Sequence, residues 1–144
     1  MQHRRSNMLR GLGTLSDWAD ELELYLENTE PLYRQKEAVR LNLVRHYCRG
    51  HFTPEKAAKG FAHVTDRAAR DYQKEFGTKI PTLARRELDR ELVTVWKRDV
   101  NDCLRGSCLG LNAEQRLLLT GRKCKISTPL AGRASRRRHR KRRS

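Results

Sequence analysis

Apolar residues recur at three- and four-residue steps along most of the chain, in five segments separated by short polar or glycine-containing stretches. These segments span about residues 16–28, 31–49, 54–76, 81–106 and 112–121. Such a period places the apolar side chains on one face of an α-helix, whereas a strand would need strict alternation. We find no stretch that alternates for long enough to indicate a strand. The pattern therefore predicts an all-α fold, a small helical bundle of about four longer helices plus one short helix.

Residues that favour helix ends bound these segments. Proline is favoured at the first helical position, which Pro31 and Pro54 occupy in the second and third segments. Gln115 lies three residues after Asn112, which is the spacing of a capping box. The N-caps that we expect are Thr14 or Ser16, Thr53 and Asn112, and the expected stops are Gly50, Gly77, Gly106 and Gly121.

The first two segments carry opposite charge and are expected to be neighbours, because only residues 29–31 connect them. The first has an acidic polar face, and the second carries the bases Arg34, Lys36, Arg40, Arg45 and Arg49, which we expect to face away from the core. Their polar edges can then neutralise each other, which is a structural role for charge.

The net charge of +15, from 32 Lys and Arg against 17 Asp and Glu, is distributed unevenly. Residues 1–15 carry +3, residues 16–120 carry +1 and residues 121–144 carry +11. We therefore expect a basic, flexible N-terminal arm over 1–15, a helical domain over 16–120 and a disordered, arginine-rich C-terminal tail over 121–144. Such an excess of cations indicates a polyanionic partner, first of all nucleic acid.

The arginine-rich tail is the strongest functional signal. Residues 133–143 contain nothing apolar enough to order a backbone, and their guanidinium groups can bind phosphates through paired hydrogen bonds. Segments of this kind that fold on binding are a common solution for RNA, and the domain shows no recognisable DNA-reading module, so RNA is favoured over DNA. The expected contacts are Arg133, Arg136, Arg137, Arg138, Arg140, Lys141, Arg142 and Arg143, with Arg122, Lys123 and Lys125 nearer the domain.

A secondary basic face is a weaker candidate on the fourth segment. It comprises Arg85, Arg86, Arg90, Lys97 and Arg98. Acids are interleaved with these bases, so a solvated face whose charges pair with each other is the favoured interpretation.

The resulting hypothesis is a non-enzymatic RNA-binding protein, such as a viral accessory protein or a suppressor of RNA-based defence. The alternative is a helical protein–protein interaction or scaffold subunit of a ribonucleoprotein, in which the tail is a nuclear import signal or an anchor. Trp18 and Trp96 are either exposed docking residues or, as we favour, core residues. A homodimer through the helical domain is compatible with the apolar faces, membrane binding is not expected, and the location is the nucleus or nucleolus in a eukaryotic cell and otherwise the cytoplasm.

The sequence contains no phosphate-binding glycine loop, HExxH motif or nucleophile elbow, so we expect neither catalysis nor a cofactor. The four cysteines are expected to be free thiols, because no secretion signal is apparent. Zinc is the weaker alternative, with His46, Cys48 and His51 near one helix end and Cys103 and Cys108 near another. We expect Cys108 and Cys124 to lie in loops, where they could link two copies on oxidation.

Overall fold

A computed structural model describes residues 13–130 and confirms the all-α fold. Over that range the chain forms α2 (Leu15–Glu27), α3 (Glu30–Cys48), α4 (Pro54–Phe76), α5 (Thr82–Leu104) and α6 (Ala113–Thr120). It contains four longer helices and one short helix, and no strand within the described residues. Residues 1–12 of the expected N-terminal arm lie outside this range.

The expected capping residues begin the helices. Thr14 accepts a hydrogen bond from the amide of Asp17, whose side chain returns to the Thr14 amide in a capping box. Asn112 and Gln115 form a second capping box at the start of α6. Gly77 ends α4 with a φ of 71°, a left-handed conformation that a side chain would strain. Local sequence therefore fixes most helix boundaries to within a residue or two.

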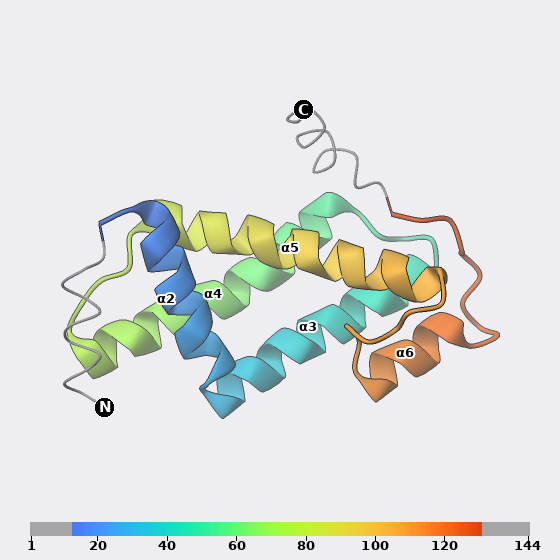
Figure 1. The fold of residues 1–144 in the computed structure, drawn as a ribbon, viewed down its shortest axis with the longest axis horizontal. Coiled ribbons are helices and arrows are strands. Elements are labelled where there is room, and N and C mark those ends of the chain that lie inside the picture. The colour runs from blue at the N-terminus through green and yellow to red at the C-terminus, as the bar shows by residue number, and fades with distance from the viewer. Residues whose placement is uncertain (1–12, 131–144) are drawn as a thin grey trace.

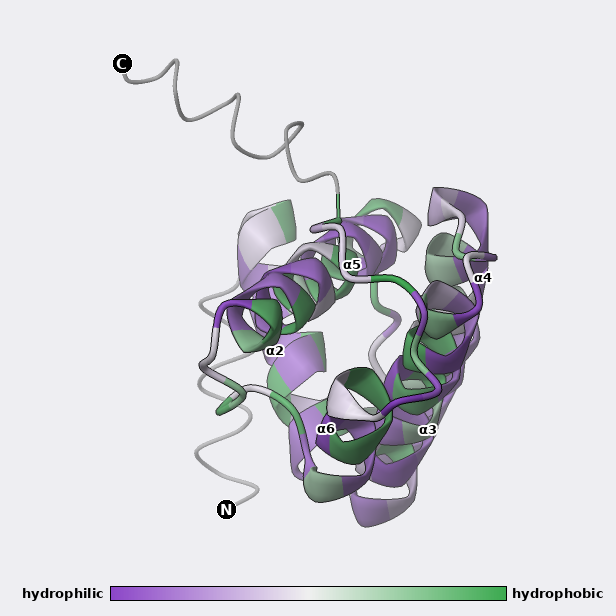
Figure 2. Ribbon diagram, turned by 90° about the vertical axis from the view of Figure 1, so that its right-hand side faces the viewer, coloured by the Kyte–Doolittle hydropathy of each residue, from purple (hydrophilic) through white to green (hydrophobic). Residues whose placement is uncertain are grey.

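The helices enclose one apolar core that extends along the molecule. The helix α5 runs along the long axis and packs against α2 at one end, α4 beside it and α6 at the other end (Figure 1). Trp96, Tyr72 and Phe61 are completely buried in this core, and Phe52 stacks on Trp96 with ring centroids 5.2 Å apart. The burial of Trp96 confirms that it is a core residue. Many apolar residues face the interior, as the end view in Figure 2 shows.

Two basic side chains of α3 that we expected to face outward are buried, which corrects that expectation. Arg40 is 5% exposed and forms an ion pair with the buried Asp99 of α5 at 3.0 Å. Its guanidinium also donates to the carbonyl of Gly110 at 2.8 Å. Lys36 is 8% exposed and pairs with Glu27 of α2 at 2.5 Å, which confirms that charges of the first two helices neutralise each other. A hydropathy pattern assigns Arg and Lys to the surface and cannot show such partners.

All four cysteines form intrachain disulfides, so the expectation of free thiols is wrong. Cys48 at the end of α3 is bonded to Cys124, and Cys103 at the end of α5 is bonded to Cys108. These pairs leave no thiolate for a zinc ion and no free thiol to link two copies. The first pair forms because the segment after α6 folds back onto the end of α3, 76 residues earlier in the chain, whereas the second pair closes a short loop of the chain after α5.

Packing continues beyond residue 120, where we expected the helical domain to end. The residues 121–130, which we call the C-terminal strap, follow α6 and lie along the ends of α3 and α5 (Figure 1). Ile126 and Leu130 pack against the core. Among the described helices, none is long and apolar enough to span a bilayer.

Candidate nucleic-acid interface

The second half of α3 and the first half of α4 form a strongly basic region. Residues 41–63 contain one acid, Glu55, and three histidines. Their four cationic side chains are Arg45, Arg49, Lys56 and Lys59, all exposed. Within residues 13–130, neither Arg45, Arg49 nor Lys59 has a carboxylate partner, and Lys56 donates instead to the carbonyl of His51 at 2.8 Å. These charges are therefore free to meet an external anion.

The C-terminal strap adds three more cations to this region. The strap is held against the end of α3 by the disulfide between Cys124 and Cys48. The Lys125 amide also donates a hydrogen bond to the Cys48 carbonyl at 3.2 Å. Farther along, the Tyr47 hydroxyl donates to the Thr128 carbonyl at 2.6 Å. The side chain of Asn101 accepts a hydrogen bond from the Leu130 amide at 2.7 Å and donates one to the Leu130 carbonyl at 3.2 Å. The exposed cations that this attachment carries are Arg122, Lys123 and Lys125.

Helical geometry joins the two sets of cations into one surface. Successive residues are rotated by about 100° around the axis of α3, so Arg45 and Arg49 lie on the same face of the helix. Cys48 lies on one side of this face, and Asn42 and His46 lie on the other side. The side with Cys48 contacts the strap, and the side with Asn42 and His46 faces α4. We call the resulting surface the basic end; its members are Arg45, Arg49, Lys56, Lys59, Arg122, Lys123 and Lys125.

The electrostatics of His46 are consistent with this concentration of cations. The pKa of its imidazole is lowered, first by burial and then by the nearby Lys56, Arg49 and His51. Basic side chains from the end of α3, from the loop and from α4 thus act on the same imidazole. An anion bound there would reduce this repulsion.

The secondary basic face on α5 is mostly neutralised. Arg85 pairs with Asp66 of α4 at 3.2 Å, and Arg86 pairs with Asp66 at 2.6 Å and with Asp89 at 2.7 Å. Farther along, Arg98 lies 3.5 Å from the carboxylate of Asp99. Lys97 is half-buried, and Arg90 is exposed. The charges of this face thus pair partly with acids of α5 itself and partly with Asp66 of the neighbouring helix.

The arginines of the expected tail lie outside the described residues. The described residues end at Leu130, and Arg133, Arg136, Arg137, Arg138, Arg140, Lys141, Arg142 and Arg143 follow it in the sequence. The structure does fix their point of attachment, which is Leu130 bound to Asn101 at the end of a basic strap.

The sequence analysis missed the contribution of Arg45, Arg49, Lys56 and Lys59. A signal was present, because residues 38–54 contain no acid and Arg45 and Arg49 are four residues apart on one helix face. The average over residues 16–120 concealed it, since the five acids of α2 cancel these bases in the sum without lying near them.

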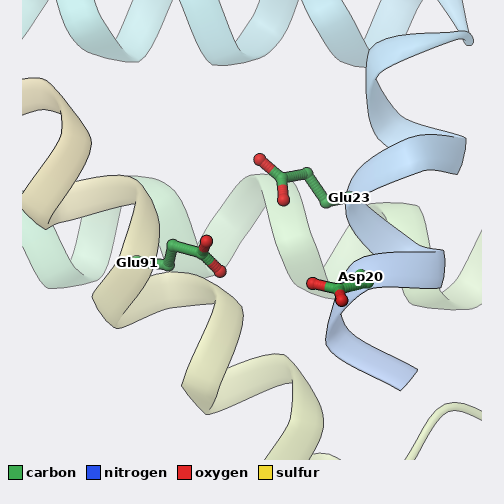
Figure 3. A group of neighbouring side chains, drawn as sticks. All are labelled: Asp20, Glu23 and Glu91. Carbon is green, nitrogen blue, oxygen red and sulfur yellow. The ribbon is translucent and has the colours of Figure 1, made fainter. Parts of the chain in front are cut away.

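A cluster of three carboxylates lies between α2 and α5, away from the basic end. Oxygen atoms of Asp20, Glu23 and Glu91 lie within 4.8 Å of one another, and Figure 3 shows the three side chains converging from the two helices. Burial raises the pKa of Glu23, as do the charges of Glu91, Glu27 and Asp20. Burial and the charge of Asp20 likewise raise the pKa of Glu91. Oxygen ligands of this kind suit hard divalent cations, and protonation would relieve the same repulsion.

Comparisons with known proteins give no relative for this chain: no family model, curated protein or solved structure matches it. Function must therefore be argued from the chemistry of the two charged ends.

Proposed function

We propose that this chain is a non-enzymatic nucleic-acid-binding protein that favours RNA. In this proposal the arginine-rich residues 133–143 supply most of the affinity, and the basic end supplies a fixed surface beside them. The observation that carries the proposal is the arrangement of the strap, which places three exposed cations next to Arg45 and Arg49 and leads directly into the arginine-rich segment.

The physical basis is the release of counterions from a phosphate backbone. Each phosphate neutralised by Lys or Arg releases condensed cations, so affinity falls as salt rises. Six to eight such contacts predict a slope of log affinity against log salt of roughly −4 to −7. The seven cations of the basic end can add to those of the tail, because the strap that is bonded to the end of α3 leads directly into the tail. This mode gives affinity with little sequence discrimination.

The acidic α2 gives the proposed complex an orientation. It lies at the opposite end of the molecule from α6 and the strap (Figure 1) and carries five carboxylates without a base, of which Glu27 is paired with Lys36 of α3 and Glu21 is buried. A polyanion is attracted to one end and repelled from the other, which steers its approach. Arginine also stacks on unpaired bases, which supports the preference for RNA with single-stranded regions.

The test is filter binding of single- and double-stranded RNA, and of DNA of the same sequence, across a series of salt concentrations. Deletion of residues 133–144 is expected to abolish tight binding, and the double variant Arg45→Gln/Arg49→Gln should reduce the magnitude of the salt slope by about 2. Lys74→Gln/Lys79→Gln is the matched control, because it removes two exposed charges outside the basic end. Wild-type affinity after the tail deletion would contradict the proposal.

A second candidate function, a helical scaffold that binds protein partners, is favoured by exposed leucines near α6. Leu117 on α6 is 72% exposed and Leu109 in the preceding loop is 92% exposed. Pull-down from cell extract with and without nuclease separates the two functions. Partners that remain after nuclease treatment and are lost in Leu109→Ser/Leu117→Ser would favour the scaffold.

A further inference from the structure

A groove between α3 and α4 lies within the basic end and has a different character from the surface around it. It has a volume of about 240 Å³. Apolar atoms of Val39, Leu43 and Gly60 contribute to its lining. Its polar lining residues are Asn42, His46, Lys56, Lys59 and His63. The groove thus combines an apolar surface with cationic and amide groups.

The groove depends on a close approach of the two helices. A Cβ atom on Gly60 would lie 2.9 Å from Cγ1 of Val39, which is closer than real side chains pack. Glycine at this position lets α4 lie against α3. The approach brings Asn42 and His46 on one helix opposite Lys56, Lys59 and His63 on the other. The polar groups therefore converge from two helices and do not form a row along one of them.

The charge of the groove is of one sign. Among its lining residues there is no acid. Lys59 has no ion pair within residues 13–130, and Lys56 is directed by its hydrogen bond to His51. The groups whose charge acts on His46 are Arg49 at the end of its own helix, Lys56 on α4 and His51 in the loop, and all are basic. Such a site favours an anion, and its apolar part favours an aromatic or sugar group attached to that anion.

We infer that this groove binds one nucleotide unit, with its phosphate on Lys56 and Lys59 and its base or ribose against Val39, Leu43 and Gly60. Asn42 can donate and accept hydrogen bonds at the edge of a base. The source of the nucleotide is a strand bound along the basic end, and in this respect the inference rests on the proposed function. It assigns to the folded domain the specific contact that an arginine-rich tail lacks.

The first part of the test uses small probes on the full chain. Uridine 5′-monophosphate and inorganic phosphate are titrated separately, with the side-chain amide of Asn42 and the backbone amide of Gly60 followed by NMR. The mononucleotide should shift both signals and bind more tightly than phosphate. Lys56→Gln/Lys59→Gln should weaken its binding at least about tenfold, since hydrogen bonds to charged groups are stronger than those between neutral groups. The matched control, Lys74→Gln/Lys79→Gln, removes the same charge elsewhere and should bind like the wild type.

The second part repeats the titration with a single-stranded RNA of about 20 nucleotides. If the RNA shifts the same two amides and displaces the mononucleotide, the nucleotide in the groove belongs to a bound RNA strand. Shifts with the mononucleotide alone would keep the groove as a nucleotide site and identify a free nucleotide as its occupant. Absence of groove shifts with either probe would overturn the inference even where RNA binds elsewhere. Groove shifts with the mononucleotide in a chain that binds no RNA would instead contradict the proposed function alone.

Discussion

At one end of the molecule, α2 carries five carboxylates and no base in 13 residues, whereas residues 41–63 and the strap at the other end carry seven cations and one acid. The net charge of about +1 over residues 16–120 therefore conceals the acidic charge of α2 and the basic charge of residues 41–63, and the three cations of the strap lie outside that range. Charges separated by more than about 10 Å are largely screened at moderate salt, so each end presents its own sign to a partner. Charge summed along a chain predicts solubility better than it predicts the surface that a ligand meets.

The two regions also differ in what surrounds their charges. At the acidic end, α2 is packed against other helices, and Glu23 is crowded by further carboxylates. At the basic end, Arg45, Arg49 and Lys59 lie exposed without ion pairs among the described residues. Between the ends, bases such as Arg40 are buried and neutralised. The comparison thus separates cations that hold the fold from cations available to a ligand.

The largest expected effect on stability comes from removing a cation that holds the fold together. Arg40→Ala leaves the carboxylate of Asp99, only 7% exposed, without its main partner and removes a donor to the Gly110 carbonyl. Breaking a buried ion pair from one side costs about 3–5 kcal/mol. Urea unfolding followed by circular dichroism measures this loss. The double variant Arg40→Ala/Asp99→Ala should recover part of it, because no unpaired charge then remains.

The matched variant at the basic end is Arg45→Ala on the same helix. Its side chain is exposed and makes no ion pair within the described residues, so stability should change by at most about 0.5 kcal/mol. RNA affinity should fall in Arg45→Ala. Equal losses of stability in Arg40→Ala and Arg45→Ala would remove the distinction between the two kinds of cation.

The next effect concerns the disulfide that holds the strap to the basic end. Cys48 and Cys124 enclose 76 residues, whereas Cys103 and Cys108 are five residues apart. From the lost constraint on the unfolded chain, we expect replacement of the first pair by serines to lower the free energy of unfolding by about 4 kcal/mol. The same replacement of the second pair should lower it by about 2 kcal/mol. Thermal and urea unfolding of the two double variants measures both.

Only the first pair should also affect RNA binding, because it fixes Arg122, Lys123 and Lys125 beside α3. Equal RNA affinity in the two double variants would show that the cations of the strap contribute to RNA binding without the Cys48–Cys124 disulfide. Disulfides persist in oxidising surroundings, whereas the cytosol and nucleus keep thiols reduced. The comparison should therefore be repeated with and without a thiol reductant, and the nuclear location stays a prediction.

Most of the fold could be predicted from the sequence because it is encoded locally. Caps such as Thr14, Thr53 and Asn112 act within three residues of themselves, and an apolar period requires only one helix. The Cys48–Cys124 disulfide and the burial of Arg40 could not be predicted, because their partners lie 76 and 59 residues away. Cys103 and Cys108 are only five residues apart, and that pair is missed because the lack of an apparent secretion signal predicts free thiols. Local signals define helices, and only their packing defines the two distant pairs.

The candidate site divides along the same line. Arg122, Lys123 and Lys125 could be predicted from charge density in the sequence alone. The contribution of Lys56 and Lys59 could not, because they lie beside Asn42 and His46 only after α4 packs on α3. Gly60 gave no sign of its role, since the residue that it approaches, Val39, lies on another helix.

The smallest effect, and the one that tests the comparison most directly, is the same substitution made at both ends. Burial and neighbouring carboxylates raise the pKa of Glu23 in the folded protein. The folded state therefore binds its proton more tightly than the unfolded state, and stability is lost as pH rises from the ordinary pKa of 4.5 through the raised value. Glu23→Gln removes that penalty and should stabilise the protein at pH 7 by up to about 0.5 kcal/mol, with no gain near pH 3.

Glu55 lies at the first turn of α4, among the cations of the basic end, where its negative charge is favourable. Glu55→Gln should therefore destabilise the protein at pH 7 by a few tenths of a kcal/mol, opposite in sign to Glu23→Gln. Differences this small are resolved by urea titrations of the two variants and the wild type run in parallel at pH 3 and pH 7. Raised salt should shrink both effects, since screening weakens repulsion at one end and attraction at the other. The same sign for both substitutions would mean that the two ends do not differ in local potential, and the basis for directing a polyanion to one of them would be lost.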